Sequence, residues 1–551
     1  MASLTVQIDT PVLREADARR PAVVPDGARF AVWVVAAVAI AATLTLPFLV
    51  VDTPAVLDYP NHLARFYILA HPHDPILSRM YAPHWRVLPN LGMDILGAQL
   101  LRLVSPSVGG RLLLALSLLA PVGGVLVYHR IVFRRFSYWP LAAALAAYNG
   151  VFFLGFMNFL LGIGLGLMAA GGWIGLRRRG DYWRAGLMGG MASAVLFLCH
   201  IFGVAYFALL IGSWELSRLD EARRGGALQA RTIVRTTALI ALALAPAAAL
   251  YLASPMASAT SLGPWEGSSK LWALFTPFMI YSRPLTLLTG AAVFATVILA
   301  WRTATIGAGV RTALVVLAAL YVAAPAEFKG GTFIDIRLAL MAGLLLCAGL
   351  DPPLPRPRVG LIIAVTFGGL LLLRSACVAA AWIDHREDLA DVRAAIAPVA
   401  PGARVLVARG DASGRTDVRP AGRAIPGLYR LDGHLGSLLV IERHAFWPLL
   451  FADPSQQPLI VNAPYRDIAQ PIGDTIDWRD LRPAAPTVQA LTSAAYLRQW
   501  RARFDYVLLF DADKASGPIP EGLEPVRMTP YAALYRIQGH SGPDADSSPQ
   551  H

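Results

Sequence analysis

The chain has 551 residues, of which 56% are hydrophobic and only 15% are charged. Because soluble proteins carry roughly 25% charged residues, this composition excludes an ordinary soluble protein. The formal net charge is +12, but most of the arginine excess stands beside long apolar runs, where anionic lipid headgroups account for it. We therefore expect a polytopic membrane protein with no nucleic-acid partner.

The first 28 residues include Arg14, Arg19 and Arg20, and the apolar run that follows them lacks a small-residue cleavage site. This pattern predicts a cytoplasmic tail (1–28) and a retained membrane anchor. A bilayer core about 30 Å thick needs roughly 20 apolar residues per helix, and about eleven runs approach this length. The predicted spanning helices are 30–50, 108–128, 138–156, 157–176, 185–200, 201–216, 232–253, 284–301, 311–325, 337–350 and 359–381.

Arginines divide the loops between these runs into two alternating sets, and short cytoplasmic loops are the ones that collect Lys and Arg. The arginine-rich set comprises 130–135, 177–184, 218–235, 302–311 and 356–358. The other set includes the long loop 51–107, which we place outside together with everything after the last run. We expect a multi-pass protein of a bacterial-type inner (plasma) membrane, with a membrane domain over 29–383 and an extracytoplasmic C-terminal domain.

The outer loop 51–107 contains aromatic and apolar stretches, and loops of this length are usually functional or folded. Its segment "LDYPNHLARFYIL" predicts a helix that begins after Asp58, because Pro60 suits a first helical turn. On such a helix Asp58, His62 and Arg65 would share one face. The later stretch "HWRVLPNLGMDILGAQLLRLVSPSVGG" predicts an interfacial helix near 90–104, a break at proline, and then a spanning helix.

Glycines recur in the fourth run, at Gly162, Gly164 and Gly166. Small residues at this spacing predict close packing against a neighbouring helix rather than a path for a substrate. The three cysteines, Cys199, Cys347 and Cys377, fall in or beside predicted spanning helices, so no disulfide framework or metal-binding CxxC motif is expected.

The region 384–551 has no apolar run long enough to span a bilayer. It predicts helices over "REDLADVRAAIAPV" and "VQALTSAAYLRQWRARF", and strands over "ARVLVA", "SLLVIE", "PLIV", "DYVLLF" and "YAALYRI". This alternation indicates a small soluble α/β domain. The last residues, "SGPDADSSPQH", have the composition of a disordered tail.

In this layout the sequence resembles the type C (GT-C) superfamily of polytopic membrane glycosyltransferases, which includes the protein O-mannosyltransferases and the lipid A aminoarabinose transferases. The resemblance covers roughly residues 30–135: a first membrane helix, an outer loop opening with an acidic motif and an amphipathic helix, a second interfacial helix and a further spanning helix. One position departs from the family pattern, because Tyr59 follows Asp58 where many relatives have a second acidic residue.

The resemblance implies an enzyme that transfers a sugar, with inversion at the transferred carbon, from a polyprenyl-phosphate donor. The acceptor would be an envelope glycan, lipid or protein on the outer face. Asp58 is then the candidate general base, with His62 at helical spacing from it, while an aspartate that caps a helix is the alternative interpretation of Asp58. Asp52 is open between a second acid, a metal ligand and a solvated helix end.

Cations in the outer loops are candidates for binding the donor phosphate. The segment "PAEFKGGTFIDIRLAL" places Lys329, Asp335 and Arg337 at the outer start of a spanning run, although interfacial Lys and Arg also simply reach toward lipid headgroups. His200 is predicted at an outer turn, where an ionisable residue at membrane depth suggests function. The substrate-binding candidates are Arg65, His200, Arg283, Lys329, Asp335 and Arg337.

No set of residues with metal-ligand spacing stands out. The resemblance leaves a divalent cation, Mg²⁺ or Mn²⁺, open, since some members use one and others do not. Two other functions also remain open: a transporter or flippase of lipid-linked glycans, and a noncatalytic envelope assembly protein that kept the fold but lost the chemistry.

Overall fold

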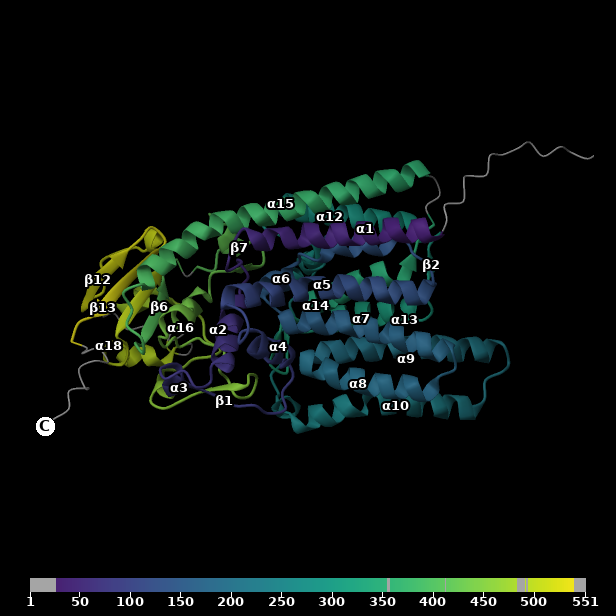
Figure 1. Cartoon of the computed structure of the whole chain (residues 1–551), viewed down its shortest axis with the longest axis horizontal. Coiled ribbons are helices and arrows are strands. Elements are labelled where there is room, and N and C mark those ends of the chain that lie inside the picture. The colour runs from purple at the N-terminus through teal and green to yellow at the C-terminus, as the bar shows by residue number, and fades with distance from the viewer. Residues whose placement is uncertain (1–25, 354–356, 412, 483–490, 492–493, 540–551) are drawn as a thin grey trace, which may run out of the picture.

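In the computed structural model, long helices lie side by side in a bundle, and a smaller α/β unit covers one end of that bundle (Figure 1). The structure describes residues 26–353, 357–411, 413–482, 491 and 494–539. Most of the predicted cytoplasmic tail and the predicted disordered segment 541–551 lie outside the described residues.

The long helices reproduce the predicted apolar runs, with one exception. They are α1 (Asp26–Thr45), α5 (Pro106–Phe133), α7 (Met157–Arg178), α8 (Tyr182–Cys199), α9 (Ile201–Arg224), α10 (Ala230–Ala253), α12 (Arg283–Ala300), α13 (Val310–Ala323), α14 (Ile334–Gly349) and α15 (Pro357–Ile396). Within the described part of the chain, six helices are long and apolar enough to cross a membrane. The full number of about eleven spans stays a prediction.

The prediction of a single helix over 138–156 is wrong. The segment forms the 3₁₀ helix η2 (Trp139–Ala146) and the short helix α6 (Gly150–Leu154). Between them, the side chain of Asn149 accepts a hydrogen bond from the Phe152 amide at 2.9 Å. Arg374 of α15 donates to the carbonyl of Tyr148, which lies at the break, at 2.6 Å. Side chains therefore satisfy the backbone groups that the break exposes, as a low-dielectric surrounding requires.

Helices α5 and α7 touch through their glycines, as the sequence predicts. A Cβ atom on Gly164 would lie 2.4 Å from the carbonyl oxygen of Ala120, and one on Gly124 would lie 2.4 Å from the carbonyl oxygen of Gly164. Gly162 and Gly166 approach Gly203 of α9 in the same way. The absence of side chains at these positions lets three helix backbones pack closely.

Helix α15 runs along the bundle and continues into the C-terminal unit (Figure 1). The predicted span 359–381 and most of the predicted helix "REDLADVRAAIAPV" thus form one helix, and the predicted boundary between 383 and 384 falls inside it. The end of α15 packs against the sheet of the C-terminal unit.

That sheet has five strands in the order β10-β6-β11-β13-β12. Strand β6 pairs in parallel with β10 and β11, whereas β13 is antiparallel to both β11 and β12. The strands are β6 (Val405–Arg409), β10 (Ile476–Asp477), β11 (Tyr506–Phe510), β12 (Leu523–Met528) and β13 (Ala532–Ile537). The predicted strands "ARVLVA", "DYVLLF" and "YAALYRI" are confirmed.

The predicted strand "SLLVIE" is wrong, because this segment ends η6 (Leu435–Ser437) and forms α16 (Leu438–Arg443). In a short buried apolar run, periodicity alone cannot show whether the segment is a helix or a strand. Of the second predicted helix, 488–490 and 492–493 lie outside the described residues. The rest of it forms η9 (Ala495–Gln499) and α18 (Trp500–Arg503).

The outer loop 51–107 is folded, and it lies against the C-terminal unit. It contains α2 (Tyr59–Ala70), α3 (Leu77–Met80), β1 (Tyr81–Pro83) and α4 (Gly92–Leu100), which confirms both predicted helices. Strand β1 pairs with β9 (Leu459–Val461), and the buried Asn61 bonds the backbone of Leu449 and Phe451 at 2.9 and 2.8 Å. Loop and C-terminal unit therefore form one layer over the bundle.

The arginine-rich loops meet at the opposite end of the bundle. Strand β2 (Thr305–Ile306) pairs with β5 (Leu350–Asp351), and Arg135 pairs with Asp351. The remaining short elements are η1 (Leu46–Leu49), η3 (Pro255–Ser258), α11 (Gly267–Ala273), η4 (Thr276–Phe278), β3 (Glu327–Phe328), β4 (Gly331–Thr332), η5 (Ala421–Arg423), β7 (Ala424–Ile425), β8 (Tyr429–Arg430), η7 (Tyr465–Ile468), η8 (Trp478–Leu481) and η10 (Ala512–Lys514). The two predicted sets of loops thus lie at different ends of the molecule.

Candidate functional site

Asp58 is fixed where the outer loop meets the helix bundle. Its amide donates to the carbonyl of Leu154 at 3.2 Å, and the preceding Leu57 amide donates to Phe153 at 2.9 Å. Gly155 follows with φ +88°, and a Cβ atom there would lie 2.8 Å from the Cβ atom of Asp58. The last two carbonyls of α6, the short helix after the break, thus hold the backbone at Asp58.

The Asp58 carboxylate faces the C-terminal domain. Asp58 occupies the N-cap position of α2 but makes no side-chain capping hydrogen bond. Its Oδ1 atom instead lies 3.1 Å from Nδ1 of His434, and both side chains are mostly buried. The contact lacks the alignment of a hydrogen bond. The structure therefore does not show the capping role that the sequence left open for Asp58.

His62 and Arg65 form a second pair on α2. Nη2 of Arg65 lies 3.0 Å from Nδ1 of His62, and Nε of Arg65 lies 2.6 Å from the buried carboxylate of Asp94. Burial, and after it the charge of Arg65, lowers the pKa of His62 well below its usual value. Burial raises the pKa of Asp94 although Arg65 opposes this. Arg65 already has a carboxylate partner, so a phosphate would compete with Asp94 for it.

Arg337 is a buried cation in the first turn of α14. It is 7% exposed, and no carboxylate of the described residues lies within 4.0 Å of its nitrogens. Its Nε atom has no hydrogen-bond partner, and its guanidinium lies over the ring of Phe156 at 4.2 Å. Phe156 follows Gly155, which lies against Asp58, so Arg337 and Asp58 contact neighbouring residues of the same turn.

His200 faces Arg337. Its Nδ1 atom lies 3.0 Å from the Phe202 amide, and its Nε2 atom lies 2.8 Å from Nη1 of Arg337. A neutral imidazole has only one acceptor nitrogen, so it can accept only one of these two hydrogen bonds. The competition leaves one N–H donor without an acceptor, which favours an anionic or carbonyl ligand beside Arg337.

Four other predicted residues have their contacts elsewhere. Asp52 pairs with Arg393 at 2.7 Å, and Lys329 donates to the carbonyls of Ala257 and Ala259. The carboxylate of Asp335 accepts from the amide of the next residue, Ile336. The fourth, Arg283, is exposed at the start of α12.

Residues of the C-terminal unit complete the site, and none of them is among the candidates predicted from the sequence. His434 contacts Asp58 directly, and the ring of Phe451 lies 4.9 Å from that of His434 and 5.4 Å from that of His62. Burial raises the pKa of Tyr429, and the Asp58 carboxylate adds to this effect. No local pattern around "LDGHLG" predicts that its histidine reaches a loop more than three hundred residues earlier in the chain.

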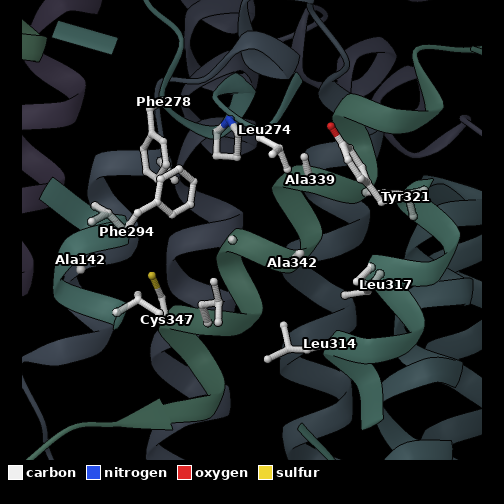
Figure 2. A pocket seen from close by; sticks show the side chains of 18 of the residues that line it. Ala142, Leu274, Phe278, Phe294, Leu314, Leu317, Tyr321, Ala339, Ala342 and Cys347 are labelled. Atoms are coloured by element: carbon white, nitrogen blue, oxygen red, sulfur yellow. The ribbon is translucent and has the colours of Figure 1, made fainter. Parts of the chain in front are cut away.

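An apolar cavity of about 510 Å³ lies between α12, α13 and α14 (Figure 2). Ala339, Ala342, Gly343 and Leu346 line it from α14. These residues are three or four positions apart and share one face of the helix, and Arg337 projects from the opposite face. Tyr321 and Leu274 lie at its outer end, and their neighbour Lys270 donates to the carbonyls at the end of α13.

The site does not fit a protein-bound divalent cation. Within the described ranges, no group of three His, Cys, Asp or Glu side chains could hold a metal ion. Asp58 and His434 would supply only two ligands, whereas protein-bound Mg²⁺ or Mn²⁺ prefers octahedral oxygen surroundings.

The chain was compared with protein families, curated proteins and solved structures. No protein-family model matches the sequence, and no curated protein matches it either. The chain is similar to the crystal structure of ArnT from Cupriavidus metallidurans bound to undecaprenyl phosphate, with 11% sequence identity and a TM-score of 0.46. The similarity covers 93% of this chain and 98% of that chain. The helices of the chain itself establish a polytopic helical membrane architecture.

Proposed function

We propose that this protein is a membrane glycosyltransferase that transfers a sugar from a polyprenyl-phosphate donor to an envelope glycan, lipid or protein on the outer face. The observation that carries the proposal is that the Asp58 carboxylate and a buried arginine without a carboxylate partner, Arg337, contact the adjacent residues Gly155 and Phe156. A carboxylate can accept the proton of an attacking hydroxyl, and an arginine can hold the leaving phosphate.

Arg337 and His200 suit the phosphate. An unpaired buried charge is costly, so a site that keeps one gains from an anionic ligand. His200 can accept from only one of its two neighbours, the Phe202 amide and Nη1 of Arg337, and a phosphate oxygen would accept from the arginine. Burial strengthens the interaction because the local dielectric constant is low.

Asp58 suits the general base. The acceptor hydroxyl oxygen forms a bond to the anomeric carbon of the sugar while the bond from that carbon to the phosphate oxygen breaks. The hydroxyl proton moves to Asp58, and the polyprenyl phosphate leaves with the electron pair of the broken bond. Attack opposite the leaving group inverts the sugar carbon.

The apolar cavity suits a prenyl chain. Its lining is made of aliphatic and aromatic side chains of helices in the bundle (Figure 2), and such a surface takes up hydrocarbon. Because α14 separates the cavity from Arg337, a donor that used both would pass around the first turn of α14, close to Phe333.

The test is transfer from a panel of radiolabelled polyprenyl-phosphate sugars to an envelope extract, with the purified protein in nanodiscs. We expect transfer by the wild type, a loss of about 100-fold or more in Asp58→Asn, and weaker donor binding in Arg337→Gln. Asp74→Asn is the matched control, because Asp74 is another outer-loop aspartate that lies beside a histidine, 3.4 Å from His444.

Equal transfer by wild type and a folded Asp58→Asn variant would remove Asp58 as the base. No transfer from any donor, together with movement of a lipid-linked glycan across proteoliposomes, would favour a transporter. Absence of both activities would favour an envelope assembly protein.

A further inference from the structure

We propose that His434 of the C-terminal domain is a positioning residue for Asp58: its imidazole holds one carboxylate oxygen so that the other faces the acceptor hydroxyl. This inference rests on the proposed role of Asp58 as the base. It gives the C-terminal domain a part in the reaction itself, beyond contact with acceptors.

The imidazole of His434 lies directly against the Asp58 carboxylate. Nδ1 of His434 lies 3.1 Å from Oδ1 of Asp58 and has no hydrogen-bond partner among the described residues. Hydrogen bonds of catalytic groups are often poorly aligned before substrate binds. The ring is held by Phe451 at 4.9 Å and by Trp447 at 6.1 Å. A small movement of Asp58 is enough to complete the hydrogen bond.

Hydrogen bonds hold the segment that carries His434 in place. Two residues earlier, the carboxylate of Asp432 accepts from Arg409 at 2.8 Å and from the Tyr531 hydroxyl at 3.0 Å. The carbonyl of His434 accepts from the Ser437 hydroxyl at 2.8 Å. The imidazole is therefore supported by the sheet of the C-terminal domain, as a group that positions another must be.

Asp58 is held in place by two parts of the molecule. Its backbone is bonded to Leu154, which belongs to the bundle, while its carboxylate meets His434. A carboxylate held from one side only would rotate about its side-chain bonds. The ionisable groups around this pair in the described residues are His62, Arg65, Asp94, His200, Arg337, Tyr429 and Asp432.

The experiment compares His434→Asn with His434→Phe in the full-length protein in nanodiscs. The amide of asparagine keeps an N–H donor near the position of Nδ1, whereas phenylalanine keeps the ring and removes the donor. We expect kcat to fall about 10- to 100-fold in His434→Phe, the range expected for a misplaced catalytic group, and the asparagine variant to recover most of it. The KM for the donor should stay within about twofold, because the phosphate contacts are unchanged.

The pH profile provides a readout that a purely structural role would not change. Without the donor beside it, the Asp58 carboxylate is easier to protonate, so the acid limb of the kcat profile should move to higher pH in His434→Phe. The control is His444→Phe, which removes the imidazole that lies beside Asp74 and should leave the limb in place.

The outcomes separate this inference from the proposed function. Inactive Asp58→Asn with wild-type kcat and pH profile in His434→Phe would overturn the inference and leave the base in place. Wild-type transfer by Asp58→Asn would overturn both. Equal losses in His434→Phe and His434→Asn, with an unshifted acid limb, would assign His434 a structural role and overturn the inference.

Discussion

At Gly155, both the backbone conformation and the available space require glycine. The residue has φ +88°, and a Cβ atom would meet Asp58 at 2.8 Å. L-residues pay an energetic penalty in this region of the backbone map, about 1 to 2 kcal/mol. A side chain here would also push directly on the residue we assign as the base.

We therefore expect Gly155→Ala to lower transfer by about 10-fold or more, since a small displacement of a catalytic group is costly. The matched control is Gly180→Ala. Gly180 has a similar φ of +77° but nothing within 4 Å of its Cβ position, so this variant carries the strain alone. Transfer and thermal stability of the two variants are measured side by side. Equal transfer by the two variants would show that the added methyl group does not displace Asp58, or that the position of Asp58 does not affect transfer.

Asp432 links the chemistry of single residues to the stability of the C-terminal domain. Burial raises its pKa, but Arg409 and Arg430 outweigh burial, and the pKa falls to about 2. An aspartate in an unfolded chain has a pKa of about 3.9. The folded state therefore binds the proton less readily, and the carboxylate contributes roughly 2.6 kcal/mol above pH 5, which is lost as the pH falls toward 2.

We expect the stability advantage of the wild type over Asp432→Asn to shrink by about 1 kcal/mol between pH 5 and pH 3. Urea titrations of the detergent-solubilised proteins at several pH values measure this difference. A difference that stays constant over this range would show that Asp432 is not the group that titrates.

At the scale of elements, the contact between α5 and α7 depends on glycine for a reason that does not apply to other helical glycines. Replacing glycine by alanine within a helix normally stabilises it by about 0.5 to 1 kcal/mol. At Gly164 the added methyl group would lie 2.4 Å from the backbone of Ala120, so the two helices would have to separate.

Replacement by alanine should therefore change the melting temperature in opposite directions at Gly164 and at an uncrowded helical glycine. Gly164→Ala should lower the thermal melting temperature, whereas Gly212→Ala, in α9 with nothing within 4 Å, should leave it unchanged or raise it. Thermal unfolding in one detergent compares them. A stabilised Gly164→Ala would contradict the close packing of α5 and α7.

At the scale of the whole molecule, three parts meet at Asp58: the bundle through Leu154, the outer loop through α2, and the C-terminal domain through His434. The apolar cavity lies on the other side of α14 from Arg337. If a prenyl chain occupies this cavity, the KM for the donor should depend on the length of the prenyl chain.

Ala342→Phe should fill the cavity and raise the KM for long-chain donors while leaving a short-chain donor nearly unaffected. Ala364→Phe is the control, because Ala364 is exposed on α15 and is not one of the residues that line the cavity. Kinetics with donors of two prenyl lengths test this. An equal effect of Ala342→Phe on both donors would place the prenyl chain elsewhere.

The sequence by itself determined the membrane class, the positions of most long helices and the folded outer loop that begins with Asp58. These follow from composition, apolar run length and local helix signals, which act over a few turns of the chain. It placed Arg337 and His200 among its candidates because ionisable residues beside apolar runs are conspicuous. It also put forward Asp52, Lys329, Asp335 and Arg283, whose contacts in the structure lie elsewhere.

Only the tertiary structure decided which candidates meet. At the break near Asn149, the carbonyl of Tyr148 is satisfied by Arg374, which lies far along the chain and is not indicated by the local sequence. The contact of His434 with Asp58 and the approach of His200 to Arg337 likewise join segments separated by hundreds and by more than a hundred residues. Periodicity and propensity describe neighbours in sequence, whereas the geometry of this site depends on how the outer loop, the bundle and the C-terminal domain pack together.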